Sequence, residues 1–238
     1  FSSRQGIACD GGMASGARRQ VDTAMDDSAI ILNYTKIRDN LIVVHALTRA
    51  YGRKSFLVKT GAKAKMAYYL PLNILELSIT ENTKSDLWYA SPLAAKYPLL
   101  GIRNNVFKNT MSLFMAEVIY RTIKDGAQED GLFDWCVRQI LTLDALQTDF
   151  SNYHIYFLLE FCIALGFRPE ATDMIPFTGE YQPFVEQFMR SDLPTAMLIP
   201  LSGRVRSEIA SSIIRYLEFH TESTINIRSL QVLHELST

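Results

Sequence analysis

Cysteine is scarce in this sequence, and the patterns that mark metal sites and disulfide frameworks are missing. Its three cysteines, Cys9, Cys136 and Cys162, are far apart, odd in number and form no Cys-x-x-Cys pair. The four histidines are equally isolated. We therefore expect no metal site and no cofactor. Cys136 and Cys162 fall on the apolar faces of predicted helices, which favours buried thiols in a reducing compartment.

The sequence also lacks a long hydrophobic run. Its most apolar stretch, residues 155–167, is too short to cross a bilayer and carries Glu160 in its middle. No secretory signal is recognisable at the beginning of the chain. We therefore expect a cytoplasmic protein without a membrane partner.

Motifs for nucleotide binding and covalent catalysis are absent as well. Gly11, Gly12 and Gly16 are not followed by the Gly-Lys-Ser/Thr of a phosphate-binding loop, and no strand precedes them. There is no Gly-x-Ser-x-Gly elbow, and the acids in residues 125–134 resemble helix ends and caps. These absences favour a protein that is not an enzyme and has no small-molecule substrate.

What the sequence does have is an uneven distribution of charge. Residues 25–80 contain eight basic and four acidic side chains, a net charge of +4, whereas residues 81–238 contain 13 and 19, a net charge of −6. Six of the bases and no acid lie in 49–65. Such asymmetry is expected where one part of a protein meets a polyanion, although a solvated charged face is the alternative.

The order of predicted elements indicates an α+β protein. Residues 1–24 have no apolar period and read as a disordered extension or a tag remnant. Residues 25–92 contain five short strand patterns, typical of a five-stranded OB-type (oligonucleotide-binding) β-barrel. These strands are expected at 29–34, 41–47, 55–58, 70–80 and 86–90. The alternation changes phase between Ile74 and Leu75, which predicts a β-bulge there.

Residues 93–238 are expected to form an α-helical domain with a loop-rich segment at 168–201, where five of the eight prolines lie. Apolar spacing and capping residues place the helices at 106–124, 132–146, 153–165, 184–189, 202–220 and 229–236. Asn104 or Asn105, Asp130, and Ser151 or Asn152 are the expected N-caps, and Gly166 the expected stop of the third helix.

The basic segment interleaves cations with aromatic side chains, as nucleic-acid binding requires. Lysine and arginine release counterions when they bind phosphates, and aromatic rings stack on bases. Tyr51, in a predicted turn, is the favoured stacking residue, whereas Phe56 is expected in the core. The candidate DNA-binding residues are Lys36, Arg38, Arg49, Tyr51, Arg53, Lys54, Lys59, Lys63 and Lys65.

A second candidate site lies on the first long helix of the helical domain. Phe107, Met111, Phe114 and Val118 recur at helical spacing, so core packing is the default interpretation. The alternative is a groove for a partner peptide formed by Phe107 and Met111, with Lys108 and Arg121 as its basic rim.

The order of these features resembles the RecO family of bacterial recombination mediators, particularly its Bacteroidetes members. The resemblance covers residues 29–236 in order and with similar spacing. It is carried by Leu-Thr-Arg-Ala-Tyr-Gly-Arg-Lys-Ser-Phe-Leu-Val at 47–58, Leu-Pro-Leu-Asn-Ile-Leu-Glu-Leu at 70–77, Met-Ser-Leu-Phe-Met-Ala-Glu-Val-Ile-Tyr-Arg at 111–121, and Arg-Ser-Leu-Gln-Val-Leu-His-Glu-Leu at 228–236.

The resemblance implies an OB barrel on a helical domain that binds single- and double-stranded DNA. It also implies annealing of complementary strands near the nucleoid, and cooperation with RecR and with the acidic tail of single-stranded DNA-binding protein (SSB) to load recombinase. Many family members have a four-cysteine zinc motif where this chain has residues 168–190 without cysteine, so no zinc is expected. A protein-interaction adaptor and an RNA-binding OB-fold protein are the alternative functions.

Overall fold

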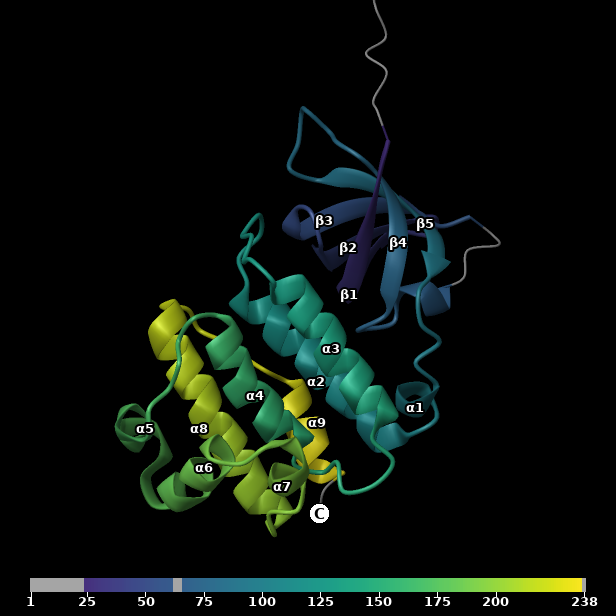
Figure 1. Ribbon diagram of the computed structural model, residues 1–238. Helices are drawn as coiled ribbons and strands as arrows, with labels where there is room; N and C mark the ends of the chain where they lie inside the picture. Colours follow the sequence, from purple (N-terminus) through teal and green to yellow (C-terminus); the bar gives the residue numbers. More distant parts are fainter. Residues whose placement is uncertain (1–23, 62–65, 237–238) are drawn as a thin grey trace, which may run out of the picture.

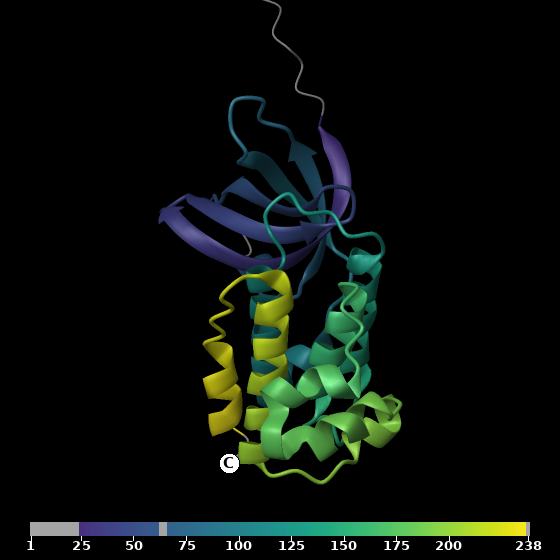
Figure 2. The same cartoon turned by 90° about the vertical axis from the view of Figure 1, so that its left-hand side faces the viewer.

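The computed structural model describes residues 24–61 and 66–236 of the protein. A β-barrel lies at one end of the molecule, and the helices form a second body beside it (Figure 1). The view turned by 90° shows the longest helices running away from the barrel (Figure 2). The two bodies follow one another in the chain, which confirms the predicted α+β class.

Five strands close the barrel in the order β1-β2-β3-β5-β4. They are β1 (Met25–Arg38), β2 (Leu41–Thr48), β3 (Gly52–Lys59), β4 (Ile74–Thr80) and β5 (Trp88–Ala95). A short 3-10 helix, Met66–Tyr69, precedes β4. All neighbouring pairs are antiparallel except β3 and β5, whose parallel contact is restricted to two residue pairs. This closed arrangement confirms the OB-type barrel.

The strand boundaries differ from the expected ones in four strands. β3 begins at Gly52 rather than Ser55, and β4 begins at Ile74 rather than Leu70, because Leu72 has a φ of 62° in a turn before it. β1 extends beyond the predicted 29–34 in both directions, because it first pairs with β4 and then continues along β2. β5 lies later than the predicted 86–90, since Pro92 does not interrupt it. It begins at Trp88 and ends at Ala95, five residues before the first helix begins at Leu100.

The predicted bulge between Ile74 and Leu75 is wrong. The register with β1 continues without a shift through Ala29–Leu75 and Ile30–Ile74. Both positions are apolar because both faces of β4 are buried at this point: Leu75 faces the barrel interior and Ile74 faces the helices. The irregularities lie on β1, around Leu32 and Ile37, and opposite Glu76 and Leu77.

The long helices agree with the predicted ones to within two residues at each end. The helices are α1 (Leu100–Arg103), α2 (Val106–Thr122), α3 (Leu132–Ala145), α4 (Tyr153–Ala164), α5 (Ala171–Thr178), α6 (Gln182–Met189), α7 (Leu193–Met197), α8 (Gly203–Thr221) and α9 (Ser229–Glu235). A 3-10 turn, Gly179–Tyr181, joins α5 to α6.

Two of the predicted caps are confirmed and one is wrong. The Asn105 side chain accepts a hydrogen bond from the Lys108 amide at the start of α2. Gly166 has a φ of 86° and directly follows the C-cap of α4, as expected. Asp130 does not cap α3, because the N-cap is Gly131 with a φ of 75°. Asn152 is the N-cap residue of α4, as predicted, but its side chain does not cap the helix and its amide donates to the carbonyls of Ala196 and Ile199.

The expected loop-rich segment 168–201 is helical, which corrects the sequence-based prediction. It contains α5, α6 and α7. Pro183 and Pro194 lie in the first turns of α6 and α7, where a proline loses no helical hydrogen bond. Pro176 lies within α5. Two of the five prolines in this segment therefore lie at helix starts rather than in loops.

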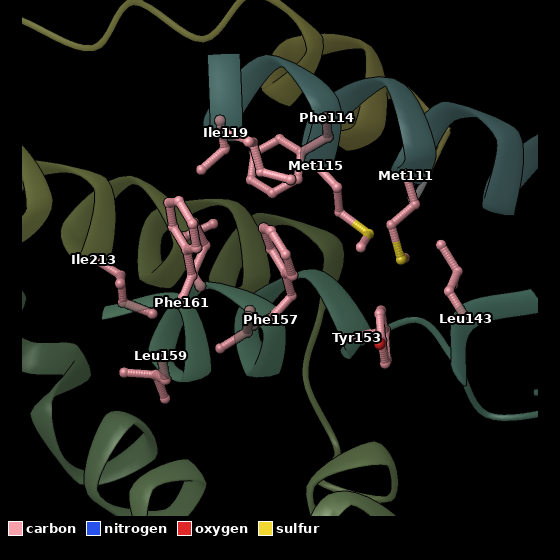
Figure 3. Close-up of a cluster of buried hydrophobic side chains, with 14 of the residues drawn as sticks. Met111, Phe114, Met115, Ile119, Leu143, Tyr153, Phe157, Leu159, Phe161 and Ile213 are labelled. Atoms are coloured by element: carbon pink, nitrogen blue, oxygen red, sulfur yellow. The ribbon is translucent and has the colours of Figure 1, made fainter. Parts of the chain in front are cut away.

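The barrel and the helices have separate apolar cores that meet through the barrel wall. Phe56, Leu75 and Leu77 are among the residues that fill the barrel. The helical core continues onto the outer face of the barrel, where it includes Ile30 and Leu47. Side chains from α2, α4 and α8 converge in its centre (Figure 3). Cys136 and Cys162 belong to it as buried free thiols, as expected.

Because His154 is buried in α4, we expect protein stability to fall as the pH decreases. Its ring meets Phe114 edge-on at 6.0 Å between centroids. Burial, with a smaller contribution from the charge of Arg206, lowers the pKa of His154 to about 3, against an ordinary value of 6.5. Between these values the unfolded chain binds a proton that the folded protein does not, so unfolding becomes more favourable as pH falls.

Urea unfolding of the wild type and His154→Gln at about pH 7 and about pH 5 measures this contribution. The variant should lose less stability between the two conditions, because its side chain does not titrate. An identical pH dependence of the two proteins would contradict the assignment.

Candidate nucleic-acid interface

The cations that are close together in the sequence are separated in space by strand β3. Arg53 lies near its beginning and Lys59 at its end. At about 3.3 Å per residue, these positions are roughly 20 Å apart. The predicted DNA-binding residues therefore form two groups, one at each end of β3. Lys63 and Lys65 lie outside the described residues.

The first group, which we call the rung cluster, consists of Lys36, Arg38 and Lys59. Arg38 pairs with Leu41 on β2, and Leu41 pairs with Lys59 on β3, so the two cations lie on one rung of the sheet. All three cations are exposed. Lys36 forms an exposed ion pair with Asp39 at 2.9 Å. The rung cluster joins β1 to the outer face of β2 and β3, the face with which OB folds bind oligonucleotides.

The second group contains Lys54 and Tyr51 beside an aromatic residue from another strand. The Lys54 ammonium lies 4.6 Å from the centroid of the Trp88 ring. Tyr51 meets the same ring edge-on at 5.1 Å, and its hydroxyl donates to the Met25 sulfur. Tyr51 and Lys54 are both half-buried. The predicted stacking site at Tyr51 therefore also includes the Trp88 ring.

Two of the predicted DNA-binding arginines contact the helical domain. The two terminal guanidinium nitrogens of Arg49 bind the Asp134 carboxylate, Nη1 at 2.9 Å and Nη2 at 2.7 Å, and the group lies 4.7 Å from the centroid of the Phe133 ring. Arg53 donates to the Ile123 carbonyl and lies 4.5 Å from the centroid of the Tyr120 ring. An ion pair as exposed as Arg49–Asp134 contributes only ~0.2–1 kcal/mol to stability.

The segment between α2 and α3, residues 123–131, reaches from the helices to the beginning of β3 (Figure 2). Its backbone pairs with Arg53 in both directions, since the Arg53 amide donates to the Ala127 carbonyl and the Gly126 amide donates to the Arg53 carbonyl. The Gln128 side chain donates to the Ala50 carbonyl. We call this set of contacts the interdomain latch.

A hydrogen-bond chain extends the latch along β2 and β3. The Ser55 hydroxyl donates to Asp125 at 2.8 Å, so its oxygen accepts from the Nδ1–H of His45 at 2.9 Å. Burial, followed by the charge of Arg53, lowers the pKa of His45, although Asp125 opposes this shift. The His45 ring lies 5.0 Å from that of Tyr120. A neutral histidine here connects barrel and helices.

The predicted partner groove on α2 is wrong in two of its four residues. Met111 is fully buried and points into the helical core (Figure 3). Lys108 is 3% exposed, and its ammonium binds the carbonyls of Asp144 and Leu146 at the end of α3. Helical spacing alone could not distinguish these core positions from a surface stripe. Phe107 is half-buried against Phe150, at 5.9 Å between centroids.

Arg121 does line a groove, but with different partners. The groove lies between β1, α2 and α9 and has a volume of about 310 Å³. Its exposed side chains include the apolar Leu113 and Val232 and the cations Arg121 and Arg228. Its acid, Glu117, already accepts hydrogen bonds from the amide and hydroxyl of Ser229. The groove is therefore apolar with a basic rim.

Trp88 and Arg228 are the members of these sites that sequence reasoning missed. Trp88 reaches Lys54 through the parallel pairing of β3 with β5, which local periodicity does not reveal. Arg228 meets α2 only because the Ser229 amide and hydroxyl dock on Glu117, 112 residues earlier in the chain. A basic residue before an amphipathic C-terminal helix was the available signal.

A closed five-stranded barrel with cations on its outer strands, joined to a helical domain, defines an OB-fold protein of the α+β class. The model for recombination protein O, N-terminal part, matches residues 23–91, and that for its C-terminal part matches residues 103–175. The chain belongs to the RecO family, which acts in DNA repair and recombination.

Proteins described as DNA repair protein RecO are similar along nearly their whole length. The one from Azobacteroides pseudotrichonymphae is 27% identical over 233 residues, which cover 87% of this chain and 97% of that protein. The one from Bacteroides fragilis is 26% identical over 235 residues, with 87% and 96% covered. The Flavobacterium psychrophilum protein is 23% identical over 231 residues, with 87% and 97% covered.

The segment in which the family resemblance places a zinc motif lacks the cysteine and histidine ligands that such a motif uses. Residues 168–190 contain neither cysteine nor histidine. Across the part of the chain that the structure describes, no three cysteine, histidine or acidic side chains come together as metal ligands. In the same part, no helix is long and apolar enough to cross a membrane.

Replacing Gly52 by alanine should break the latch. Gly52 has a φ of 63°, and a Cβ there would lie 2.0 Å from the Ala127 carbonyl oxygen. We expect the variant to lose more than about 1 kcal/mol of unfolding free energy in urea, because both the backbone conformation and the close approach favour glycine. Gly61→Ala is the control, since among the described residues, its chain neighbours aside, none has an atom within 4 Å of the position of an added Cβ. Equal stability of the two variants would contradict a latch at Gly52.

Proposed function

We propose that this protein is a non-enzymatic DNA-binding mediator of recombinational repair. It binds single- and double-stranded DNA through the barrel, anneals complementary strands, and works with RecR and SSB to load recombinase. It acts in the cytoplasm at the nucleoid. The observation that carries the proposal is the rung cluster, three exposed cations on β1 and β3, the two strands that flank β2 in the OB barrel of a RecO-family chain.

The distribution of cations supports a path for a single strand along β3. Lys59 of the rung cluster lies at one end of this strand on its outer face, and Lys54 lies with Trp88 and Tyr51 near the other end, on the face that continues into the barrel interior. A single strand that met both would pass from the outer face to the end of the barrel. Lys54 and Lys59 are roughly 17 Å apart along β3, a span compatible with the ~4–16 nucleotides that one OB fold covers. Half-buried Val43 and Leu57 lie between the two ends. Phosphates would meet the cations at both ends of β3.

Binding through phosphates leaves the base edges free, which is what annealing requires. Phosphate contacts position a strand without reading its sequence. A strand held in this way can pair with its complement while still bound. The expected binding is therefore strongly salt-dependent and nearly indifferent to sequence.

Replacing Lys36, Arg38 and Lys59 by alanine should weaken single-strand binding about equally for all sequences. Each lost phosphate contact should reduce the slope of log affinity against log salt by about 0.7. Fluorescence anisotropy with labelled oligonucleotides at several salt concentrations measures both effects. The same triple variant should slow the annealing of SSB-coated complementary strands.

Arg190→Ala is the matched control, because it removes an exposed cation from the end of α6. It should leave affinity and slope unchanged. A triple variant with wild-type affinity would refute the rung cluster as the DNA site. Tighter binding of RNA than of DNA at equal salt would instead favour an RNA-binding function.

The groove between β1, α2 and α9 supports an adaptor role alongside DNA binding. We infer that it receives the acidic tail of SSB, which ends in an apolar residue. Arg121 and Arg228 would pair with the tail carboxylates, and Leu113 and Val232 would contact its apolar end. This arrangement retains Arg121 from the sequence-based prediction and leaves out Phe107, Lys108 and Met111, which do not line the groove.

A fluorescent tail peptide should bind the wild type and bind Arg121→Ala and Arg228→Ala about two- to fivefold more weakly each. Arg138→Ala, which removes an exposed cation of α3 outside this groove, should bind normally. Equal affinity of all four proteins would place the tail elsewhere.

A further inference from the structure

Arg49 differs from the other arginine of the interdomain latch in how it is held. Its guanidinium contacts one carboxylate, that of Asp134, and both side chains are about half exposed, at 50% and 51%. Arg53 is half-buried and bound to a carbonyl, and its own backbone forms two hydrogen bonds with the segment between α2 and α3. Exposed ion pairs exchange partners easily, whereas a half-buried set of backbone contacts does not. Arg49 can therefore leave its partner without opening the latch.

Arg49 binds Asp134 in the geometry with which a guanidinium also binds a phosphate. Its two nitrogens bind the two carboxylate oxygens of Asp134 side by side. A guanidinium presents the same fork to a carboxylate and to a phosphodiester. The Phe133 ring packs against the guanidinium at 4.7 Å and keeps its plane in position. Asp134 is thus bound where a nucleic-acid phosphate would bind.

The surroundings of the pair are open on one side and acidic. Arg49 and Asp134 border a pocket of about 170 Å³ at the β2–β3 turn. Glu129 and Asp130, from the segment between α2 and α3, border the same pocket. The β2–β3 turn that carries Arg49 is therefore bordered by acidic residues from the segment between α2 and α3 and from the first turn of α3.

We propose that Arg49 is a reserve phosphate contact which Asp134 occupies until single-stranded nucleic acid displaces it. The inference rests on the proposed function. Asp134 and a backbone phosphate compete for one guanidinium, so the helical domain limits how tightly the barrel holds a strand. A mediator that must pair strands and then release the duplex needs such a limit.

The test is the isosteric substitution Asp134→Asn, which removes the competing charge and retains the side-chain volume. We expect it to bind a single-stranded oligonucleotide about two- to fivefold more tightly than the wild type at low salt. The gain should shrink as salt is added, because salt already weakens the Arg49–Asp134 pair in the wild type. Anisotropy titrations at several salt concentrations measure both trends.

Asp130→Asn is the matched control. Asp130 borders the same pocket and forms no ion pair with a cation among the described residues. Neutralising it therefore changes only the overall electrostatic potential of the pocket. A gain in Asp134→Asn no larger than that in Asp130→Asn would overturn the proposal, as would unchanged or weaker binding. Urea unfolding of each variant verifies that the fold is retained.

The double variant separates the specific pair from its surroundings. Against an Arg49→Ala background, Asp134→Asn should give no more than the small effect of Asp130→Asn, because the guanidinium is gone. A full gain in the double variant would show that Asp134 acts without Arg49. If the wild type itself fails to bind single strands, the proposed function fails, and that outcome is distinct from equal binding by wild type and Asp134→Asn.

Discussion

The apolar contact between the helices and the outer wall of the barrel is the constraint on which the rest of the structure depends. Ile30, Leu32, Leu72 and Ile74 point away from the barrel interior and belong to the helical core. Neither body can expose this surface to water without losing the burial of several large side chains. The barrel wall is therefore apolar on both faces where β1 meets β4, and the helices have one permitted position against it.

That position determines which cations remain available to a ligand. It brings the segment 123–131 and the first turn of α3 onto the β2–β3 turn and the beginning of β3, where they bind Arg49, Arg53 and Ser55. The opposite end of β3 stays uncovered, with Arg38 and Lys59 exposed on one rung. A charge count along the chain treats all these residues alike. Arg49 and Arg53 bind residues in 120–134, at the contact between barrel and helices, whereas Arg38 and Lys59 remain exposed.

Several elements were predictable because their signals are local. Apolar spacing and the Asn105 cap define α2, and Gly166 ends α4 where a left-handed residue is needed. The failures have non-local causes. Burial on both faces of β4 gave the same apolar pattern as a bulge. Pro92 is part of β5, where it pairs with Leu77 of β4, and two of the five prolines of 168–201 lie at helix starts. Lys108 and Met111 were misplaced because helical spacing does not tell which face meets a neighbour.

The sequence by itself determined the class of the protein, its order of barrel and helices, its basic first part and its membership of the RecO family. These properties follow from periodicity, composition and the order of motifs, all of which can be read along the chain. Only the tertiary structure decided which cations are free, that Trp88 accompanies Lys54, and that Asp134 covers Arg49. The physical reason is that each of these pairs is made across a packing interface, between residues whose separation in sequence says nothing about their distance.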